Sequence, residues 1–296
     1  MRTKVLYASY VKGNSIPYYV RYALQALSAS GLSVVYITNK RTLYIEALDF
    51  LEKCEIELFF TENHGFDFGM WRRYWQSAPP QKKDSWDRLC LMNDSIVYYK
   101  NQFSDFIKRA EESTASMVSL TSSDEFSFHL QSFFLYLKSP AITQFEKHLE
   151  ETKDSDSFYD VVRNMEIGLS TRMLKSGLTL EALFNTHKDI LFSYTELIAE
   201  GAGFIKRKLL ERRFTPKEKM HFLRHGGRKS LYADYPKQIK NNGNPDNRFS
   251  LAWLPSRPKR ATSLFEEFLL LVFFYTLVYP FERVIRMLKK KTTASS

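Results

Sequence analysis

Cysteine is scarce in this chain of 296 residues, and Cys54 and Cys90 are the only two. They form no paired metal-binding spacing, which argues against a disulfide framework and against a zinc site. The sequence also has no internal repeat and no low-complexity tract, which argues against a solenoid. Because hydrophobic residues make up 44% of the chain, we expect a sizeable core in one large domain with an appended region.

Long apolar runs are also scarce. The first residues, Met1–Tyr7, enter a strand-like pattern without the apolar centre of a secretory signal, so we expect a reducing cytoplasmic compartment. One run of 14 uncharged, mostly apolar residues lies between Glu267 and Glu282, which is short of the ~20 that a spanning helix needs. A basic cluster, Lys289–Lys291, follows it. This combination predicts a segment that lies on the anionic inner face of the cytoplasmic membrane or in a core.

The charge of the chain is unevenly placed. Residues 201–296 hold 21 Lys and Arg against 7 Asp and Glu, whereas residues 1–200 hold 22 against 26. The basic excess predicts an anionic partner for the C-terminal third, either a membrane surface or nucleic acid. Because no recognised nucleic-acid motif accompanies the basic residues, we expect no nucleic acid and favour the membrane. We therefore divide the chain into a globular domain, 1–200, and a basic, partly apolar helical region, 201–296.

Short apolar strands alternate with longer helical patterns in the first 140 residues. We expect strands over 4–9, 33–38, 56–60, 88–92, 116–120 and 129–137, the last of them antiparallel. Helical patterns follow the first four strands, with Ser15 as cap of the first helix, and further helices are expected at 141–150, 157–175 and 189–199. This alternation predicts an α/β fold with a mostly parallel sheet flanked by helices.

Three polar patches lie at the ends of these strands: residues 62–69, 93–95 and 129–132. In an open α/β sheet, ligands bind beyond the carboxyl ends of the strands. Loops that a rigid scaffold holds carry function more often than other segments do. We therefore expect the first two patches to form one site, and the third to line it.

Asp94 follows a buried strand, between Asn93 and Ser95. An oxygen-rich cluster in this place could hold a hard divalent cation that bridges nucleotide phosphates. The same three residue types also favour a simple turn, and from spacing alone both interpretations are open.

The patch from Glu62 contains two glycines with different expected tasks. Gly65 permits a tight bend, and Gly69 permits a close approach of two backbones. Asp67 is either a ligand-binding residue or the cap of the following helix. Arg72 and Arg73 lie on that helix and face either phosphate or solvent.

Three further candidates are polar side chains beside apolar surfaces. His129 and Gln131 project to one face of the same predicted strand, which indicates either a ligand contact or a structural pair. Glu166 lies beside an apolar helical face, where a buried carboxylate could act as a general base, although an exposed glutamate is the commoner case.

Together these patches resemble the rhamnan synthesis protein F family, glycosyltransferase-like proteins of bacterial surface-polysaccharide clusters. The resemblance covers about residues 1–200 and implies a GT-A-like fold. The matching pieces are Asn63-x-Gly65-x-Asp67-Phe68-Gly69-x-Trp71, Asn93-Asp94-Ser95, His129-Leu130-Gln131-Ser132-x-Phe134 and Glu166-Ile167-Gly168-Leu169-Ser170.

The resemblance implies a glycosyltransferase with a nucleotide-sugar donor, dTDP-rhamnose, and a lipid-linked or polysaccharide acceptor at the membrane. Glu166 would be the base of an inverting reaction, and Asp94, with or without Mg²⁺ or Mn²⁺, would stabilise the leaving diphosphate. The chain has Asn-Asp-Ser where such enzymes commonly have Asp-x-Asp, which puts metal dependence in question. His129 and Gln131 would contact the sugar or the acceptor. The expected donor-binding residues are Gly13, Asn14, Asn63, Gly65, Asp67, Asn93 and Ser95.

The rival interpretation belongs to another class of protein. A non-catalytic protein could use the basic C-terminal third to bind a membrane or nucleic acid. Binding of nucleotides by the chain would discriminate between the two.

Overall fold

The computed structural model describes residues 2–211 of the chain, apart from 84 and 187. Most of the predicted C-terminal region, including the apolar run Phe268–Phe281, lies outside the described residues. Within them, no helix is long and apolar enough to cross a membrane.

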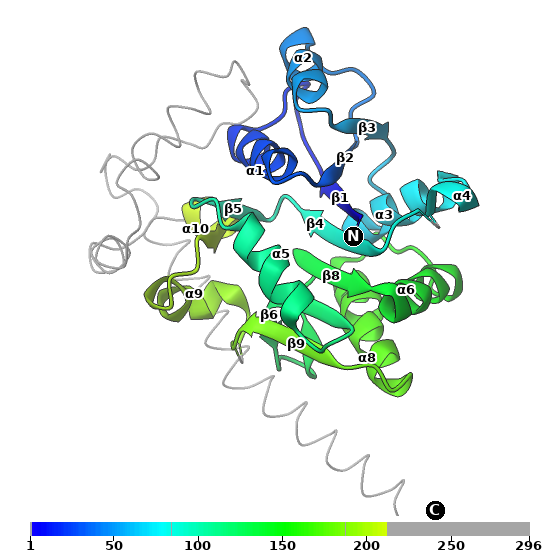
Figure 1. Ribbon diagram of the computed structural model, residues 1–296, viewed down its shortest axis with the longest axis vertical. Helices are drawn as coiled ribbons and strands as arrows, with labels where there is room; N and C mark the ends of the chain where they lie inside the picture. The colour runs from blue at the N-terminus through cyan, green and yellow to red at the C-terminus, as the bar shows by residue number, and fades with distance from the viewer. Residues whose placement is uncertain (1, 84, 187, 212–296) are drawn as a thin grey trace, which may run out of the picture. The chain divides into compact units, whose positions relative to one another are not determined.

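One eight-stranded sheet forms the centre of the described part (Figure 1). The strand order is β3-β2-β1-β4-β8-β6-β7, and β9 pairs with β6. The short strands β7 and β8 are antiparallel to their neighbours, and the other strands are parallel to one another. The predicted mostly parallel α/β sheet is therefore confirmed. The strands are β1 (Thr3–Ser9), β2 (Ser33–Thr38), β3 (Glu57–Phe60), β4 (Arg88–Asn93), β6 (Met117–Ser123), β7 (His129–Leu130), β8 (Phe134–Lys138) and β9 (Leu180–Phe184).

The helices that were expected from the sequence are present, and the long helical pattern at 157–175 contains a π-helical segment, η1. A second, two-stranded sheet pairs β5 (Ile96–Tyr98) with β10 (Phe204–Lys206). The helices are α1 (Tyr18–Ala29), α2 (Ile45–Lys53), α3 (Phe66–Ser77), α4 (Pro80–Lys83), α5 (Phe103–Glu112), α6 (Ser139–Glu151), α7 (Phe158–Val161), η1 (Val162–Ile167), α8 (Gly168–Lys175), α9 (Ile190–Ala199) and α10 (Arg207–Glu211).

Two local predictions are wrong. Ser15 does not cap α1, because Pro17 is the N-cap residue and its carbonyl accepts the first helical hydrogen bonds. The single strand predicted over 129–137 is divided into β7 and β8, with residues 131–133 between them. The strand breaks there because the backbone N–H of Ser132 donates to the side chain of Glu166 instead of to a neighbouring strand.

The core explains why these segments form a parallel sheet. Alternate residues of β1, β2 and β4 join one apolar cluster with α3, α6 and α8, while α1 and α5 pack against strands of the same sheet outside that cluster. Trp71 of α3 is fully buried, and its indole N–H donates to the carbonyl of Leu6, 3.2 Å away. Strands covered on both faces are apolar throughout, which is why their sequences read as continuous apolar runs.

The winding of the sheet decides where a ligand would bind. From β1 the chain passes through β2 and β3 on one side and then returns to β4 on the other side of β1. The carboxyl ends of β1 and β4 are therefore the topological switch point, the usual ligand site of an open α/β sheet. Ser9 and Asn93 are the last residues of these two strands.

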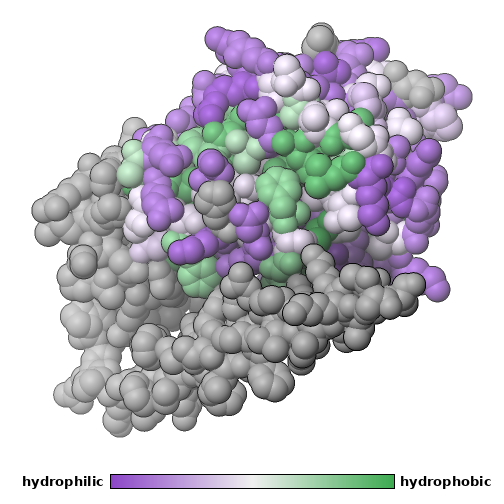
Figure 2. Space-filling view, turned by 90° about the horizontal axis from the view of Figure 1, so that it is seen from below, coloured by the Kyte–Doolittle hydropathy of each residue, from purple (hydrophilic) through white to green (hydrophobic). Residues whose placement is uncertain are grey.

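The surface is uneven in polarity. On the face that Figure 2 views, hydrophobic residues gather in the middle, and hydrophilic residues lie above them and to their right. Contiguous exposed apolar surface on a folded chain indicates an interaction site more often than isolated apolar residues do.

Candidate active site

Asp94 lies buried at the switch point, directly after β4. Its backbone N–H donates to the carbonyl of Ala8, which fixes the residue against the end of β1. Its Oδ2 accepts hydrogen bonds from Ser9 (3.2 Å), Tyr19 (3.5 Å) and Arg207 (3.1 Å). Burial raises the pKa of Asp94, and the positive charge and hydrogen bond of Arg207 counteract this shift only in part.

Arg207 brings a cation to this carboxylate from the far end of the described chain. It is the first residue of α10, and its backbone N–H donates to the carbonyl of Ser95, 2.8 Å away. Its guanidinium donates to Asp94 and also to the hydroxyl of Tyr19, 2.7 Å away. The sequence analysis missed this residue because it counted Arg207 only as part of the basic C-terminal third.

Asn93 connects Asp94 to the next carboxylate. Its Nδ2 donates to Oδ2 of Asp67 (2.5 Å), and its Oδ1 accepts from the backbone N–H and the hydroxyl of Ser95. The residues therefore form the local turn that one interpretation predicted, and the binding of a ligand by this patch stays a prediction. Asp67 is not the helix cap, because Gly65 takes that position and the Asp67 carboxylate faces Asn93 instead.

Asp67 is an unusual carboxylate. Burial, followed by the negative charges of Asp94 and Glu166, raises its pKa to about 7, although the hydrogen bond from Asn93 acts in the opposite direction. A group with this pKa changes its protonation near neutral pH, which is a property of catalytic acids and bases.

Both glycines of the first patch have the predicted tasks. Gly65 has a φ of +75°, the left-handed conformation of a tight bend that favours glycine. A Cβ at Gly69 would lie 1.9 Å from the carbonyl oxygen of His64, so only glycine allows this close approach. The loop after β3 can therefore turn sharply into α3 and place Asp67 at the switch point.

Two side chains of the helical segments η1 and α8, Glu166 and Ser170, accept hydrogen bonds from the backbone of the third patch, residues 129–132. Glu166 lies in η1, and its Oε1 accepts from the backbone N–H of Ser132, 2.7 Å away. The hydroxyl of Ser170 accepts from the backbone N–H of Leu130, 3.1 Å away. Burial raises the pKa of Glu166, and the charge of His129 together with the Ser132 hydrogen bond reduces this shift. Short π-helical segments such as η1 occur often at functional sites.

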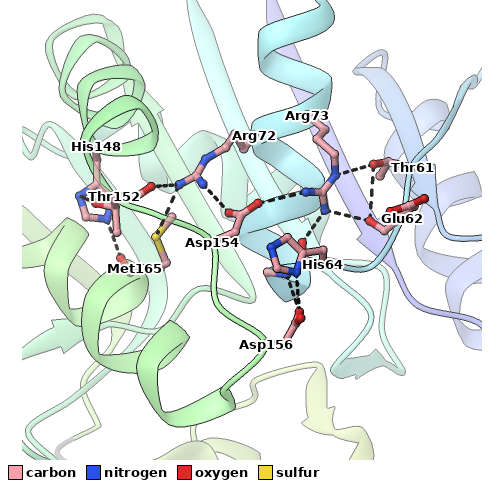
Figure 3. A network of polar contacts seen from close by, with 11 residues as sticks. Thr61, Glu62, His64, Arg72, Arg73, His148, Thr152, Asp154, Asp156 and Met165 are labelled. Carbon is pink, nitrogen blue, oxygen red and sulfur yellow. Dashed lines mark hydrogen bonds and ion pairs between the residues drawn. The ribbon is translucent and has the colours of Figure 1, made fainter.

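A network of ion pairs joins α3, which carries Asp67, to the segment before η1 (Figure 3). Arg72 and Arg73 both donate to the carboxylate of Asp154, and Arg72 also donates to the carbonyl of Thr152. The sequence analysis expected each arginine to face either solvent or phosphate. In the structure both arginines instead bind groups of the protein. The network fixes the two elements that carry Asp67 and Glu166 relative to each other.

His148 supports the π-helical segment at one side of the network (Figure 3). It is buried, and its Nε2–H donates to the carbonyl of Met165, 3.1 Å away. Burial, and then the charge of Arg172, lowers the pKa of His148 to about 4, so the ring is neutral near pH 7. It therefore acts as a hydrogen-bond donor to the backbone of η1 and not as a cation.

The third patch is held within the protein. His129 Nδ1–H donates to the carbonyl of Ser127 (2.8 Å). The carboxamide of Gln131 accepts from Thr121 (2.7 Å) and donates to Asp189 (2.9 Å). These bonds agree with the structural interpretation of the pair, and contact with a sugar or an acceptor stays a prediction.

The remaining donor-binding candidates lie on loops at the same edge of the sheet. Gly13 and Asn14 are partly exposed in the loop between β1 and α1, where the carbonyl of Asn14 accepts from the N–H of Tyr44. Asn63 is partly exposed between β3 and α3. Their role in binding a donor stays a prediction.

The donor set around Asp94 does not fit a divalent cation. Among the described residues, no three His, Cys, Asp or Glu side chains are grouped so that they could hold a metal ion. Oδ2 of Asp94 accepts three hydrogen bonds, one of them from the guanidinium of Arg207. The positive charge at this carboxylate is thus supplied by a side chain, and the predicted metal at Asp94 has no support in the geometry.

Solved structures with a related arrangement share little sequence with the chain. A 4-diphosphocytidyl-2C-methyl-D-erythritol synthase from Anaerococcus prevotii matches with 9% identity and a TM-score of 0.41, over 64% of this chain and 89% of its own. A cytidylyltransferase from Leptospira borgpetersenii matches with 10% identity and a TM-score of 0.38, over 82% and 95%. A mannosyltransferase from Pyrobaculum calidifontis, in complex with GDP-Man and Mn²⁺, matches with 11% identity and a TM-score of 0.41, over 92% and 80%.

Comparison with curated proteins gives no match. The sequence pattern of one protein family, described as rhamnan synthesis protein F, matches residues 34–238. This range contains the four motifs that meet around Asp67, Asp94 and Glu166. The chain belongs to the rhamnan synthesis protein F family.

Proposed function

We propose that the chain is a glycosyltransferase of bacterial surface-polysaccharide synthesis, with a nucleotide-sugar donor and a lipid-linked or polysaccharide acceptor. The observation that carries the proposal is the meeting of Asp67, Asp94 and Glu166 with Arg207 at the switch point of an α/β sheet. Family membership supports the reaction class, and the family description supports rhamnose as the sugar, with dTDP-rhamnose as the proposed donor.

In this proposal Glu166 is the general base. It removes the proton of an acceptor hydroxyl while that oxygen forms a bond to the anomeric carbon of the donor. The bond from that carbon to the diphosphate breaks, and the configuration of the sugar inverts. A pKa raised by burial makes Glu166 a stronger base than an exposed glutamate, and its bond to the N–H of Ser132 fixes its direction.

The leaving diphosphate gains negative charge as the bond breaks. The guanidinium of Arg207 supplies a fixed positive charge at the switch point, where Asp94, Tyr19 and the carbonyl of Ser95 hold the residue. A preorganised cation of this kind stabilises charge that develops in the transition state without reorganisation of solvent. Asp94 acts in this scheme by orienting Arg207.

A thermal-unfolding panel tests the proposed function. We expect dTDP, UDP or GDP to stabilise the protein by about 2.7 kcal/mol at a hundredfold excess over its dissociation constant, and an RNA oligomer to have no effect. Because Arg207 provides the cation at Asp94, EDTA is expected to leave the nucleotide effect unchanged.

Each arm of the panel has a result that contradicts the proposal. Stabilisation by RNA alone would favour the nucleic-acid-binding alternative. Loss of the nucleotide effect in EDTA, restored by Mg²⁺ or Mn²⁺, would show that a metal takes part in donor binding.

We further propose that the basic C-terminal region holds the enzyme on the inner face of the cytoplasmic membrane, near lipid-linked acceptors. The support is the excess of Lys and Arg in 201–296 and the apolar run Phe268–Phe281. Deletion of residues 264–296 is expected to abolish sedimentation with anionic liposomes and to leave nucleotide binding intact. High salt should weaken the full-length interaction only in part, because apolar burial is not screened. Loss of nucleotide binding in the truncated chain would instead place the run in the core.

A further inference from the structure

Four aromatic side chains on the described surface form two ring pairs, which we call the aromatic rim: Phe66, Phe126, Phe158 and Tyr159. Phe66 is partly buried and packs against the core, and the other three are exposed. Phe158 is 65% exposed, Tyr159 53% and Phe126 42%. The rings of Phe66 and Phe158 lie 6.0 Å apart, and those of Phe126 and Tyr159 lie 6.3 Å apart, both pairs edge to face. Phe158 and Tyr159 are adjacent in α7, so each pair has one member on this helix.

Two segments of the rim lead directly into catalytic candidates. Phe66 immediately precedes Asp67 at the start of α3. Phe158 and Tyr159 belong to α7, which continues without a break into η1 and Glu166. The rim therefore lies on the helix that leads to the proposed base.

Two further segments, the loop that carries Phe126 and the helix that carries Lys208, also come close to the rim. Phe126 lies in the loop between β6 and β7, shortly before His129. The ammonium of Lys208 lies 5.7 Å from the ring of Phe158, and Lys208 follows Arg207, which binds Asp94. Four chain segments that carry site residues thus each contribute a ring or a cation to one place.

The backbone of the rim is strained at two of its aromatic residues. Phe66 has a φ of 52° and Phe126 a φ of 67°, both in the left-handed region where glycine would be free of strain. Strained residues of this kind gather at functional sites. An aromatic ring in each of these positions indicates that the ring itself has a task.

We propose that the aromatic rim is the acceptor subsite and binds a saccharide ring by stacking. This inference rests on the proposed glycosyltransferase function. The C–H face of a pyranose is apolar and packs against an aromatic face, while its hydroxyl groups stay available to a cation such as Lys208. Glu166 follows Phe158 and Tyr159 by roughly 10–12 Å along the continuous helix of α7 and η1. The rim would therefore bind a unit of an oligosaccharide acceptor next to the unit whose hydroxyl faces Glu166.

The double variant Phe158→Ala/Tyr159→Ala tests the subsite, and saturation-transfer NMR with a rhamno-oligosaccharide provides the probe. We expect the affinity for the oligosaccharide to fall about 10-fold, because the variant removes both stacking faces. The affinity for dTDP or another stabilising nucleotide should not change. Ile45→Ala is the matched control, because Ile45 is 64% exposed and lies on α2, away from the four rim segments.

The outcomes separate the rim from the proposed function. Unchanged oligosaccharide affinity in the double variant, or no oligosaccharide binding by the unaltered protein, overturns the acceptor subsite even where nucleotides bind. Loss of binding to anionic vesicles, with oligosaccharide binding retained, assigns the rim to the membrane and also overturns it. Failure of every nucleotide to bind overturns the proposed function itself.

Discussion

Replacement of Glu166 by Gln is expected to reduce turnover by about 10²–10⁴-fold, the usual contribution of a positioned general base. Gln keeps the shape of the side chain and can still accept the hydrogen bond from the N–H of Ser132. It lacks the capacity to take a proton from the acceptor hydroxyl. Nucleotide affinity should remain within a factor of two or so, because the base acts on the acceptor and not on the donor. Steady-state kinetics at saturating acceptor, with a nucleotide titration, provide the measurement.

Asp67→Asn is the matched comparison, because Asp67 is the other carboxylate that could act as a base. Its pKa of about 7 means that it would lose its proton as the pH rises through neutrality, so a reaction that used it would accelerate over that range. Asn can still accept the hydrogen bond from Asn93. If Glu166 is the base, Asp67→Asn retains most of the turnover. Near-normal turnover in Glu166→Gln, with a large loss in Asp67→Asn, would transfer the role to Asp67.

Much of the fold could be predicted because its strands are buried. Strands such as β1 and β2 lie between layers of helices, so their sequences read as apolar runs bounded by polar loops. The strands that were missed have weaker patterns. β5 and β10 have three residues each, and β9 is half-buried along most of its length, so neither length nor alternation distinguishes them from loops.

The candidate site was predictable where its motifs are local. The four motifs meet in pairs, since Asn93 donates to Asp67 and Glu166 accepts from the N–H of Ser132. The sequence indicated that these patches follow strands, and the parallel sheet places their ends at one edge. It could not indicate which polar groups pair there, because those hydrogen bonds depend on packing between distant segments.

Arg207 could not be found from the sequence for the same reason. It lies 113 residues from Asp94 in the chain and reaches it only because β10 pairs with β5. Two three-residue strands give no recognisable pairing pattern. The uneven charge of the sequence grouped Arg207 with the basic C-terminal region. In the fold, however, Arg207 lies beside Asp94, in the domain that carries the candidate site.

Loss of the Arg207 guanidinium is expected to have an effect as large as loss of the base. Arg207→Met keeps the length of the apolar part of the side chain and removes the charge, so the leaving diphosphate loses its fixed cation. Removal of one such preorganised group typically costs about 10²–10³-fold in turnover. Without the guanidinium, the pKa of the buried Asp94 should rise further, since Arg207 is the main influence that lowers it. Nucleotide affinity should fall as well, in contrast to Glu166→Gln.

The contrast among three variants decides what Arg207 does. Arg207→Lys keeps a positive charge but not the planar guanidinium, whose Nη1 donates to both Asp94 and Tyr19, so we expect partial recovery of turnover. Lys108→Met removes an exposed charge on α5 and controls for the change in net charge. If Arg207 takes the place of a metal, Mg²⁺ or Mn²⁺ should not accelerate the unaltered enzyme, and EDTA should not slow it. Full turnover in Arg207→Met, or a requirement for a metal in the unaltered enzyme, would contradict this role. The Arg207–Asp94 pair would then only hold the end of β10 beside β4. The cation at the diphosphate would have to come from another group.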